Sequence, residues 1–424
     1  MIRSALRACL GPDSWRSLAP VDILLVRHDA DCGYFHDGRA YAPLTDTVGE
    51  WAAAIGLRVR AVAAPYSRLR GEDAAHDPVT INRRMFATAL LGRAVRAAAG
   101  TARGVAWADS RRTRLWKSLL RRARPHAVIG INPDSSLSRA GRHLGIPVFD
   151  LQHGLIDNQT PWYEQVATAP AGADYLPTGI LCWDEASAAE AREWAAAQGV
   201  ATSILGNPWS SRFREAAPED ELVSAALVQL PEFHIERPRI LVSLQWGLSK
   251  LHYREGKFNG VIAHALEEAI LATAGRFNWM LRLHPVQVRG DAATGVQAYL
   301  ARTFGRLPSV EWQVSTTAAL PAILSSAAAH VTDSSFVVSE AARLGVPSAI
   351  LNPAFRPGGS LERFFVAERQ SGLATLVAQD AAEIVGWIER VVQGPKTPLT
   401  GSGGRAAWMA FLQQFVAEGR SDRC

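Results

Sequence analysis

Two short polar motifs, each at the expected end of a β-strand, have side chains that could hold a phosphate. His284 follows the apolar run 279–283, and Pro285 ends that strand because proline cannot continue the hydrogen-bond ladder of a central strand. The second motif, after the strand-like run 328–332, is Asp333, Ser334 and Ser335. Imidazole and hydroxyl groups donate hydrogen bonds, and a helix N-terminus adds unpaired N–H groups and a partial positive charge. Together they predict a site for a phosphate that gains charge as it leaves.

A helix is expected directly after the second motif. Apolar residues between Val337 and Leu344 recur at helical spacing, and Gly345 takes the position of a C-cap glycine. Ser334 or Ser335 is the expected N-cap of this helix. The alternative to a phosphate site is that the serines only cap the helix. Ligands of open parallel sheets bind beyond the carboxyl ends of the strands, and this position favours a binding role.

The same pattern occurs earlier in the chain. Residues 134–147 and 333–347 both read Asp-Ser-Ser-apolar, then a helical stretch, then a basic residue, Leu, Gly, a β-branched residue and Pro. We interpret them as two copies of one strand–helix–strand unit, with chance similarity as the alternative. A repeat of this kind predicts an α/β fold with two doubly wound, Rossmann-like domains that face each other across a cleft.

The length and composition of the chain fit two domains. At 424 residues the chain exceeds one ordinary domain, and 48% apolar with 20% charged residues is a globular balance. A polar, proline-containing stretch over 208–237 is the expected linker. The predicted domains are 1–207 and 238–400, and a final helix in 401–424 is expected to return to the first domain.

Cysteine spacing and hydropathy argue against several classes of protein. The four cysteines lie far apart in sequence, so we expect neither a disulfide framework nor a metal site, and no cofactor. No apolar run reaches the roughly 20 residues that a membrane-spanning helix needs. The N-terminus also lacks the sustained apolar segment of a signal peptide. These features predict a cytoplasmic protein.

The loop after the first expected strand is rich in groups that could bind a polar substrate. It contains His28, Asp29, Asp31 and Tyr34. Asp29-Ala30-Asp31 also matches a short Asp-x-Asp pattern by which some enzymes bind a metal ion. Because the pattern is common by chance and follows the first strand rather than a later one, we favour a substrate-binding loop.

Three more polar residues lie at expected element ends of the first domain. His153 ends a strand pattern, and Gly154 would let backbone or ligand approach closely; the alternative is a structural histidine bonded to a carbonyl. Asp184 is expected to cap a helix. Asn207 lies in the turn after the strand pattern 202–205.

Residues 103–124 carry eight basic residues, two tryptophans and one acid. As a helix, this segment would present a basic, aromatic-flanked face to an anionic membrane surface, such as the inner face of an inner membrane. The alternative is a solvated helix whose arginine stems cover apolar neighbours. Nucleic acid is not an expected partner, because no helix-turn-helix, zinc-finger or RNP pattern occurs.

Together the motifs resemble those of a known family. They are LQHG, CWDEASAAE and GNPW in the first domain, and SLQWG, RLHP and TDSS…SEAARLGVP in the second. Over residues 22–365 their order and spacing are similar to those of the GT-B glycosyltransferases of bacterial surface-polysaccharide assembly. The His-Pro and Ser-Ser pair resembles that of transferases using CMP-activated sugars, namely Kdo transferases and sialyltransferases. The loop HDADCGYFHDGRAYAPLTD looks most like the retaining β-Kdo transferases of lipopolysaccharide and capsule synthesis.

The resemblance implies a role for each group of residues. The nucleotide-sugar donor, CMP-Kdo, would bind the second domain through Gln245, Trp246, Gly247, His284, Pro285, Asp333, Ser334, Ser335 and Glu340. The saccharide acceptor would bind the first domain through His28, Asp29, Asp31, Tyr34, His153 and Asn207. The implied catalytic residues are His284, His153 and a carboxylate, for which Asp184 and Glu255 are the candidates. No metal is implied, because GT-B enzymes generally stabilise the leaving phosphate with protein groups.

Other functions remain open on the same motifs. A polyol-phosphate transferase using CDP-glycerol shows similar His-Pro and Ser-Ser motifs, and sialyltransferases and nucleotide-sugar 2-epimerases share the fold. From a different class, the chain could be a non-catalytic saccharide-binding subunit of an assembly complex. The acceptor, the linkage and the stereochemical outcome do not follow from the sequence.

Overall fold

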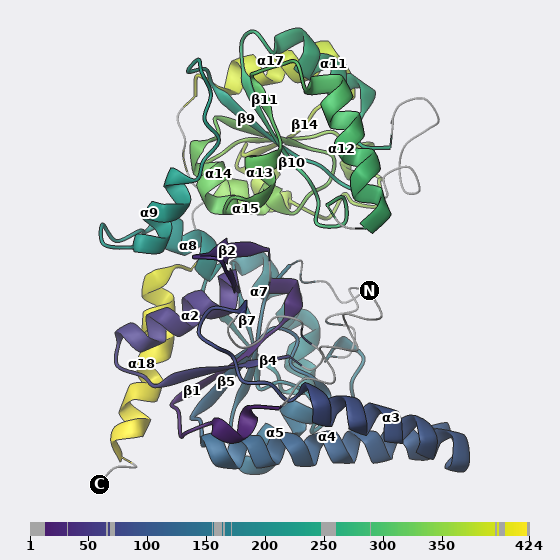
Figure 1. Cartoon of the computed structure of the whole chain (residues 1–424), viewed down its shortest axis with the longest axis vertical. Helices are drawn as coiled ribbons and strands as arrows, with labels where there is room; N and C mark the ends of the chain where they lie inside the picture. Colours follow the sequence, from purple (N-terminus) through teal and green to yellow (C-terminus); the bar gives the residue numbers. More distant parts are fainter. Residues whose placement is uncertain are drawn as a thin grey trace. The chain divides into compact units, whose positions relative to one another are not determined.

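The computed structural model divides the chain into two compact units. Unit 1 comprises residues 1–212 and 401–424, and unit 2 comprises residues 213–400. The structure describes residues 13–31, 33–64, 67, 73–154, 156, 163, 166–170, 172–246, 260–288, 290–394, 397 and 403–421. Figure 1 shows that each unit is a sheet covered by helices on both faces.

The unit 1 sheet has six parallel strands in the order β4-β1-β5-β6-β7-β8. The strands are β1 (Ile23–Arg27), β4 (Val59–Ala63), β5 (Ala127–Gly130), β6 (Val148–Leu151), β7 (Gly179–Cys182) and β8 (Ala201–Ile204). β1 and β5 are buried along their whole length, as their apolar sequences predict for strands covered on both faces. A separate antiparallel hairpin joins β2 (Tyr34–His36) to β3 (Arg39–Tyr41).

Helices cover both faces of this sheet. They are α2 (Pro43–Ala54), α3 (Asn82–Ala99), α4 (Thr101–Ala123), α5 (Ser135–Leu144), α7 (Glu185–Ala195), α8 (Pro208–Arg214) and α18 (Arg405–Ser421). α4 packs Leu115, Trp116, Leu119 and Leu120 against the strands and α5. In Figure 1, α3, α4 and α5 lie together on one side of the sheet, and α2 and α18 lie on the other.

The last helix of the chain belongs to unit 1. Trp408 of α18 is fully buried, and its Nε1–H donates to the carbonyl of Gly206 at 3.0 Å. Gly206 has φ +85°, and a Cβ there would lie 2.4 Å from the carbonyl oxygen of Gly403. This close backbone contact needs glycine at position 206. It joins the end of β8 to the start of α18.

Unit 2 contains a second parallel sheet in the order β11-β10-β9-β12-β13-β14. Its strands are β9 (Arg239–Ser243), β10 (Asn278–Arg282), β11 (Val310–Glu311), β12 (Ala329–Thr332), β13 (Ser348–Ile350) and β14 (Ala374–Leu376). Its helices are α9 (Glu221–Val228), α11 (His264–Thr273), α12 (Gly290–Phe304), α13 (Gln313–Thr317), α14 (Leu320–Ser326), α15 (Val337–Arg343), α16 (Val366–Gln370) and α17 (Ala381–Val391). α11, α12 and α17 bury one face of the sheet, and α14 and α15 bury the other.

The prediction of two doubly wound Rossmann-like domains is confirmed. Residues 127–151 and 329–350 both form strand–helix–strand units with adjacent parallel strands. Gly145 and Gly345 both have positive φ, and the following residue donates to the carbonyl four positions before that glycine. The stretch expected as linker, 208–237, contains α8 and α9, and the unit boundary falls inside α8.

One helix start was predicted incorrectly. The N-cap of α15 is Phe336 rather than Ser334 or Ser335, and no side chain caps it. Thr332 Oγ1 instead accepts the N–H of Ser335 at 3.3 Å, which tightens the turn after β12 and delays the helix. The two copies of the repeat therefore differ, because Asp134 does cap α5 through a bond from the N–H of Leu137.

Candidate active site

In unit 2 the loops that carry the predicted donor-binding residues lie at one edge of the sheet. β10, β9 and β12 are adjacent and parallel, with Arg282 and Thr332 both in register with Ser243. The loops after these strands hold His284, then Gln245 and Trp246, then Asp333, Ser334 and Ser335. The strand order reverses at β9, and ligands of doubly wound sheets bind at such a switch point.

His284 has a fixed tautomer when it is neutral. The backbone N–H of Val286 donates to its Nδ1 at 3.2 Å. Nδ1 must therefore be the acceptor, and the proton of the neutral ring lies on Nε2. Partial burial lowers the pKa of His284, which favours this neutral form. The ring thus offers one N–H donor in a defined direction.

Gln287 connects two of the loops. Its Oε1 accepts the N–H of His284 at 2.8 Å, and its Nε2 donates to the carbonyl of Gln245 at 3.2 Å. Gln287 is 4% exposed, so both bonds are protected from water. The ring of Trp246, which is 54% exposed, lies 6.1 Å from the His284 ring. The structure therefore brings Gln245, Trp246 and His284 together.

The serine motif lies at the same edge but is not in contact with His284. β9 separates β10 from β12, which corresponds to about 10 Å across two strand spacings. Among the residues that the structure describes, no hydrogen bond joins His284 to Ser334 or Ser335. Ser335 is buried, and its Oγ accepts the N–H of Val337 at 3.3 Å. Ser334 is half-buried in the same turn.

The side chains that flank the serine motif are held by their own partners. Asp333 accepts the side-chain N–H of Asn352 at 2.9 Å. Arg282 is anchored below His284 by bonds to the carbonyls of Ser315 and Ala318, both at 2.8 Å. Burial lowers the pKa of Arg282 to about 10, and Glu340 opposes this effect.

Glu340 lies on α15 within electrostatic reach of two arginines. Burial raises its pKa, while Arg343 and Arg282 lower it. Its contact with a nucleotide stays a prediction. Pro285 follows His284 in a turn beyond β10. Gly247 and Glu255 lie outside the described residues, so their predicted roles also stay predictions.

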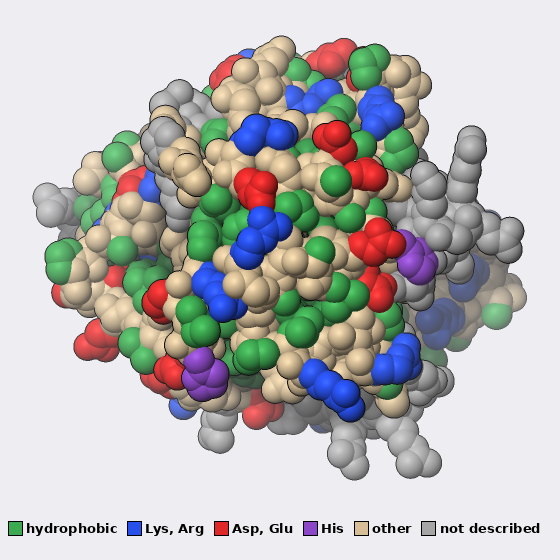
Figure 2. All heavy atoms as spheres, turned by 90° about the horizontal axis from the view of Figure 1, so that it is seen from above, with side chains coloured by type: hydrophobic (Ala, Val, Ile, Leu, Met, Phe, Trp, Pro, Cys, Tyr) green, Lys and Arg blue, Asp and Glu red, His purple; other side chains and the backbone are tan. Residues whose placement is uncertain are grey.

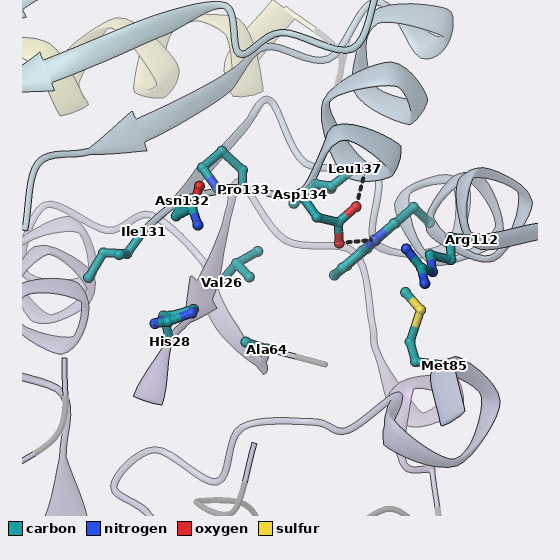
Figure 3. Close-up of a pocket in the computed structure, with 11 residues that line it drawn as sticks. Val26, His28, Ala64, Met85, Arg112, Ile131, Asn132, Pro133, Asp134 and Leu137 are labelled. Atoms are coloured by element: carbon teal, nitrogen blue, oxygen red, sulfur yellow. Dashed lines mark hydrogen bonds between the residues drawn. The ribbon is translucent and has the colours of Figure 1, made fainter. Parts of the chain in front are cut away.

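In unit 1 a cavity of about 260 Å³ lies at the other switch point, beyond β1 and β5 (Figure 3). Its polar side chains are His28, Arg112, Asn132 and Asp134. Its apolar wall is formed by Val26, Ala64, Met85, Trp116, Ile131, Pro133 and Leu137. In Figure 3, His28 and Asn132 lie on one side of the cavity, and Asp134 and Arg112 lie on the other.

The groups around this cavity are fixed by local structure. Asn132 has φ +46°, a left-handed conformation that asparagine tolerates better than most residues, and its N–H donates to Asp150 at 2.9 Å. Asp134 accepts bonds from the N–H of Leu137 and from Trp116 Nε1, both at 3.0 Å. Burial raises the pKa of Asp134, and Arg112 is among the groups that oppose this effect.

The structure also brings His28 close to His153. Burial first, and then the neighbouring His28, lower the pKa of His153 to about 4. Burial lowers the pKa of His28 as well, and Asp29 opposes it. Both rings are therefore neutral near pH 7, and both lie beyond the carboxyl ends of strands of the same sheet.

Three of the predicted acceptor-binding residues have structural partners and do not line the cavity. Asp31 is buried and accepts bonds from Leu44 N, Thr45 N and Thr45 Oγ1 at the start of α2. Asn207 is 2% exposed and accepts the N–H of Ser210, which caps α8. Tyr34 is buried against the ring of Trp209 at 5.4 Å. The exposed carboxylate of Asp29 accepts a bond from Ser67.

Asp184 caps α7, as its sequence position predicts. Its Oδ1 accepts the N–H of Ser187 at 2.8 Å. Gln152, which is 2% exposed, accepts the N–H of Trp183 at 2.6 Å and donates to the carbonyl of Gly154 and to Ser187 Oγ. Gln152 thus ties the loop of His153 to the turn that holds Asp184. In the described part of the chain, no three His, Cys, Asp or Glu side chains are grouped as metal ligands would be.

Comparison with solved structures shows that the fold is GT-B. A UDP-GlcNAc 2-epimerase from Methanocaldococcus jannaschii matches with a TM-score of 0.58 and 11% identity, covering 93% of this chain and 99% of its own. The UDP-GlcNAc 2-epimerase of Neisseria meningitidis, bound to UDP-GlcNAc, gives 0.57 at 13% identity with the same coverage. The wall teichoic acid polymerase TagF gives 0.59 at 10% identity, over 99% of this chain and 94% of its own. No protein-family model and no curated protein matches the sequence.

Proposed function

We propose that this protein is a glycosyltransferase that moves a sugar from a nucleotide-activated donor to a saccharide acceptor. The GT-B fold and the polar loops at both switch points support a transferase of this kind. The donor we propose is CMP-Kdo, on the resemblance of the His-Pro and Ser-Ser motifs and of the 28–46 loop to β-Kdo transferases. The product would then be part of a lipopolysaccharide or capsule, made at the cytoplasmic side of the inner membrane.

The observation that carries the proposal is the oriented N–H of His284. Nδ1 of His284 accepts the backbone N–H of Val286, and the backbone N–H of His284 donates to Gln287. The Nε2–H of the neutral ring is therefore the group offered at the edge of the sheet. A leaving nucleotide gains negative charge as the glycosidic bond breaks. A donor fixed in advance interacts more strongly with that charge than with the ground state, which lowers the barrier. Ser334, Ser335 and backbone N–H groups at the switch point would hold the other side of the nucleotide.

The acceptor is proposed to bind unit 1. The cavity beside His28 combines imidazole, guanidinium and amide groups with an apolar wall, which suits a saccharide's hydroxyl groups and its C–H surfaces. His28 and His153 are neutral and could accept a proton from an attacking hydroxyl. Asp184 and Glu255 stay the candidates for the catalytic carboxylate. Asp31, Tyr34 and Asn207 support the loops rather than the acceptor.

Two other enzyme functions are favoured by a specific observation. The GT-B structures that match over nearly the whole chain include UDP-GlcNAc 2-epimerases and a wall teichoic acid polymerase. An epimerase would invert a carbon of a nucleotide sugar without any acceptor. A polymerase of the teichoic acid kind would transfer a polyol phosphate from CDP-glycerol. A non-catalytic subunit would bind a saccharide and release no nucleotide.

One assay separates these functions. The purified chain is incubated with CMP-Kdo, CDP-glycerol or UDP-GlcNAc, and the free nucleotide and the inverted sugar are measured with and without acceptor oligosaccharides. Acceptor-dependent release of CMP from CMP-Kdo supports the proposal, release of CMP from CDP-glycerol supports the polyol-phosphate transferase, and inversion of UDP-GlcNAc supports the epimerase. Thermal shifts with CMP, CDP and UDP give an independent measure, because a ligand at 100 times its Kd adds about 2.7 kcal/mol to stability. If the protein bound a saccharide but released no nucleotide from any donor, the proposed transferase function would be wrong.

A further inference from the structure

α3 and α4 form a helical hairpin with an unusual charge. Residues 82–123 contain eleven Lys and Arg residues and one acid, Asp109. The rest of the chain has 34 basic and 39 acidic residues, so it is net negative although the whole protein is net positive at +5. The positive charge of this protein is therefore concentrated in the hairpin. The sequence pattern of 103–124 predicted only the second of the two helices.

Among the described residues, few acidic groups lie near the hairpin: Asp134 interacts electrostatically with Arg112, and Asp13 accepts the backbone N–H groups of Arg83 and Arg84. None of the eleven basic side chains forms an ion pair within the part of the chain that the structure describes. The one acid is committed elsewhere, because Asp109 pairs with Arg139 of α5 and accepts a bond from Ser136 at 2.9 Å. Arginines on a solvated helix can be stabilised by acids three or four residues away, and the one such acid here, Asp109 three residues before Arg112, pairs with Arg139 instead.

The two helices form one rigid surface. They join at Gly100, whose φ of +88° makes the turn, and they approach closely where a Cβ on Gly92 would lie 2.9 Å from Ala108 Cβ. Figure 1 shows them side by side along one edge of unit 1. A groove of about 480 Å³ runs between them. It is lined by Arg84, Ala87, Thr88, Leu91, Trp107, Arg111, Arg114, Leu115 and Ser118.

Large apolar side chains are exposed on this hairpin, and Leu91 and Trp107 line the groove beside these arginines. Leu90, Leu91 and Val105 are 55%, 54% and 58% exposed. Arg111 stacks over the Trp107 ring at 5.1 Å, which places a cation and an aromatic group together on the groove. A different face of the molecule, in Figure 2, shows acidic and basic side chains interspersed. Basic residues combined with exposed leucine, valine and tryptophan are typical of surfaces that lie in the interface of an anionic bilayer.

We propose that the α3–α4 hairpin docks this protein on the surface of an anionic lipid bilayer. The arginines would pair with lipid phosphates, and Leu91 and Trp107, which line the same groove, would enter the boundary between headgroups and acyl chains. Nucleic acid would satisfy the charge but would leave the exposed aliphatic side chains in water, so the bilayer is the better partner. No helix in the described ranges has the length and apolar content to cross a membrane. The proposal is independent of the proposed transferase activity.

The test is co-flotation of the full-length chain with lipid vesicles. We expect binding to vesicles that contain phosphatidylglycerol and none to vesicles of phosphatidylcholine alone. Each Arg near an anionic surface contributes roughly a five-fold factor, so the triple variant R84Q/R111Q/R114Q is expected to bind on the order of 100-fold more weakly. Binding should also fall between 0.1 M and 1 M salt, since the screening length shortens from ~10 Å to ~3 Å.

Matched variants make the result specific. R302Q/R306Q/R390Q removes the same charge from exposed arginines of unit 2 and should bind like the wild-type protein. L91S/W107S keeps every charge and should bind more weakly to anionic vesicles. Far-UV circular dichroism and melting curves confirm the fold of each variant. Equal loss in both arginine variants, or binding to neutral vesicles, would overturn the proposal. So would retention of a DNA or RNA duplex, lost in R84Q/R111Q/R114Q, without any vesicle binding.

Discussion

The backbone N–H of Val286 donates to Nδ1 of His284, and this bond decides which nitrogen of the neutral ring carries the proton. A substitution that keeps a donor at the Nε2 position should keep part of the function. We therefore expect His284→Gln, whose amide N–H reaches that position, to retain more turnover than His284→Asn or His284→Ala. Loss of one such donor typically lowers kcat on the order of 10²–10³-fold.

Nucleotide release measures this series. His264→Ala is the control, because His264 is an exposed histidine of unit 2 at the start of α11. If His284→Ala turned over every accepted donor at the wild-type rate, His284 would be a structural residue and the phosphate role would be wrong.

Gln287 is expected to position His284 and the Gln245 loop rather than to react. Gln287→Glu keeps the oxygen that accepts the His284 N–H but loses the amide that donates to the Gln245 carbonyl. Loss of one hydrogen bond costs about 0.5–1.5 kcal/mol, so we expect nucleotide affinity several-fold weaker at pH 7. Isothermal titration measures the affinity, and steady-state kinetics separate KM from kcat. A change in kcat alone would mean that Gln287 acts in the chemical step.

Asp150 should make the stability of unit 1 depend on pH. Burial raises the pKa of Asp150 to about 7, with only the Asn132 N–H opposing it. An aspartate in the unfolded chain titrates near pKa 3.9, so the folded state holds more protons between these values and stability falls as pH rises from about 4 to about 7. Asp150→Asn removes this dependence and keeps the acceptor for Asn132. We expect it to gain stability relative to wild type by up to about 3–4 kcal/mol over that range.

Chemical denaturation of the wild-type protein and of Asp150→Asn at about pH 4 and about pH 7 gives the free energy of unfolding and tests this expectation. If the free energies of unfolding of the wild type and of Asp150→Asn differed by the same amount across this pH range, Asp150 would be ionised in the folded state.

The Asp29-Ala30-Asp31 motif should stabilise α2 and should not bind a metal. Asp31 accepts three hydrogen bonds from Leu44 and Thr45, so Asp31→Ala is expected to lower the free energy of unfolding by about 1–3 kcal/mol. Asp29→Ala, at an exposed position of the same motif, should change it little. Turnover should survive EDTA. Loss of turnover on chelation, restored by Mg²⁺ or Mn²⁺, would establish a metal role instead.

The sequence predicted the elements and the strand ends better than it predicted the side chains that act there. His284 was placed beyond the carboxyl end of a strand because Pro285 cannot continue a ladder, although β10 already ends at Arg282; Asp184 was placed because a short acid before an alanine-rich helix is a strong N-cap signal. Whether such a polar residue caps a helix or binds a ligand is a tertiary property. Asn207 and Asp31 were therefore predicted as ligand-binding residues, although both bond to helix starts.

Gln152 and Gln287 were missed as positioning residues for a related reason. A glutamine in a loop has no periodicity or spacing that marks it, and both act on loops that are distant in sequence. Trp183 lies 31 residues from Gln152, and Gln245 lies 42 residues from Gln287. The charge of α3 was missed because only its packing on α4, at Gly92 and Ala108, makes the two helices one surface.

The contact of Trp408 and Gly403 with Gly206 affects the order in which this chain is completed during translation. Unit 2 is continuous, whereas unit 1 needs residues from both ends of the chain. At about 5–20 residues per second, synthesis of residues 213–400 delays the arrival of α18 by roughly 10–40 s. During that interval the groove that receives Trp408 is uncovered on the ribosome. Unit 2, although made second, is the first part of the protein that can finish folding.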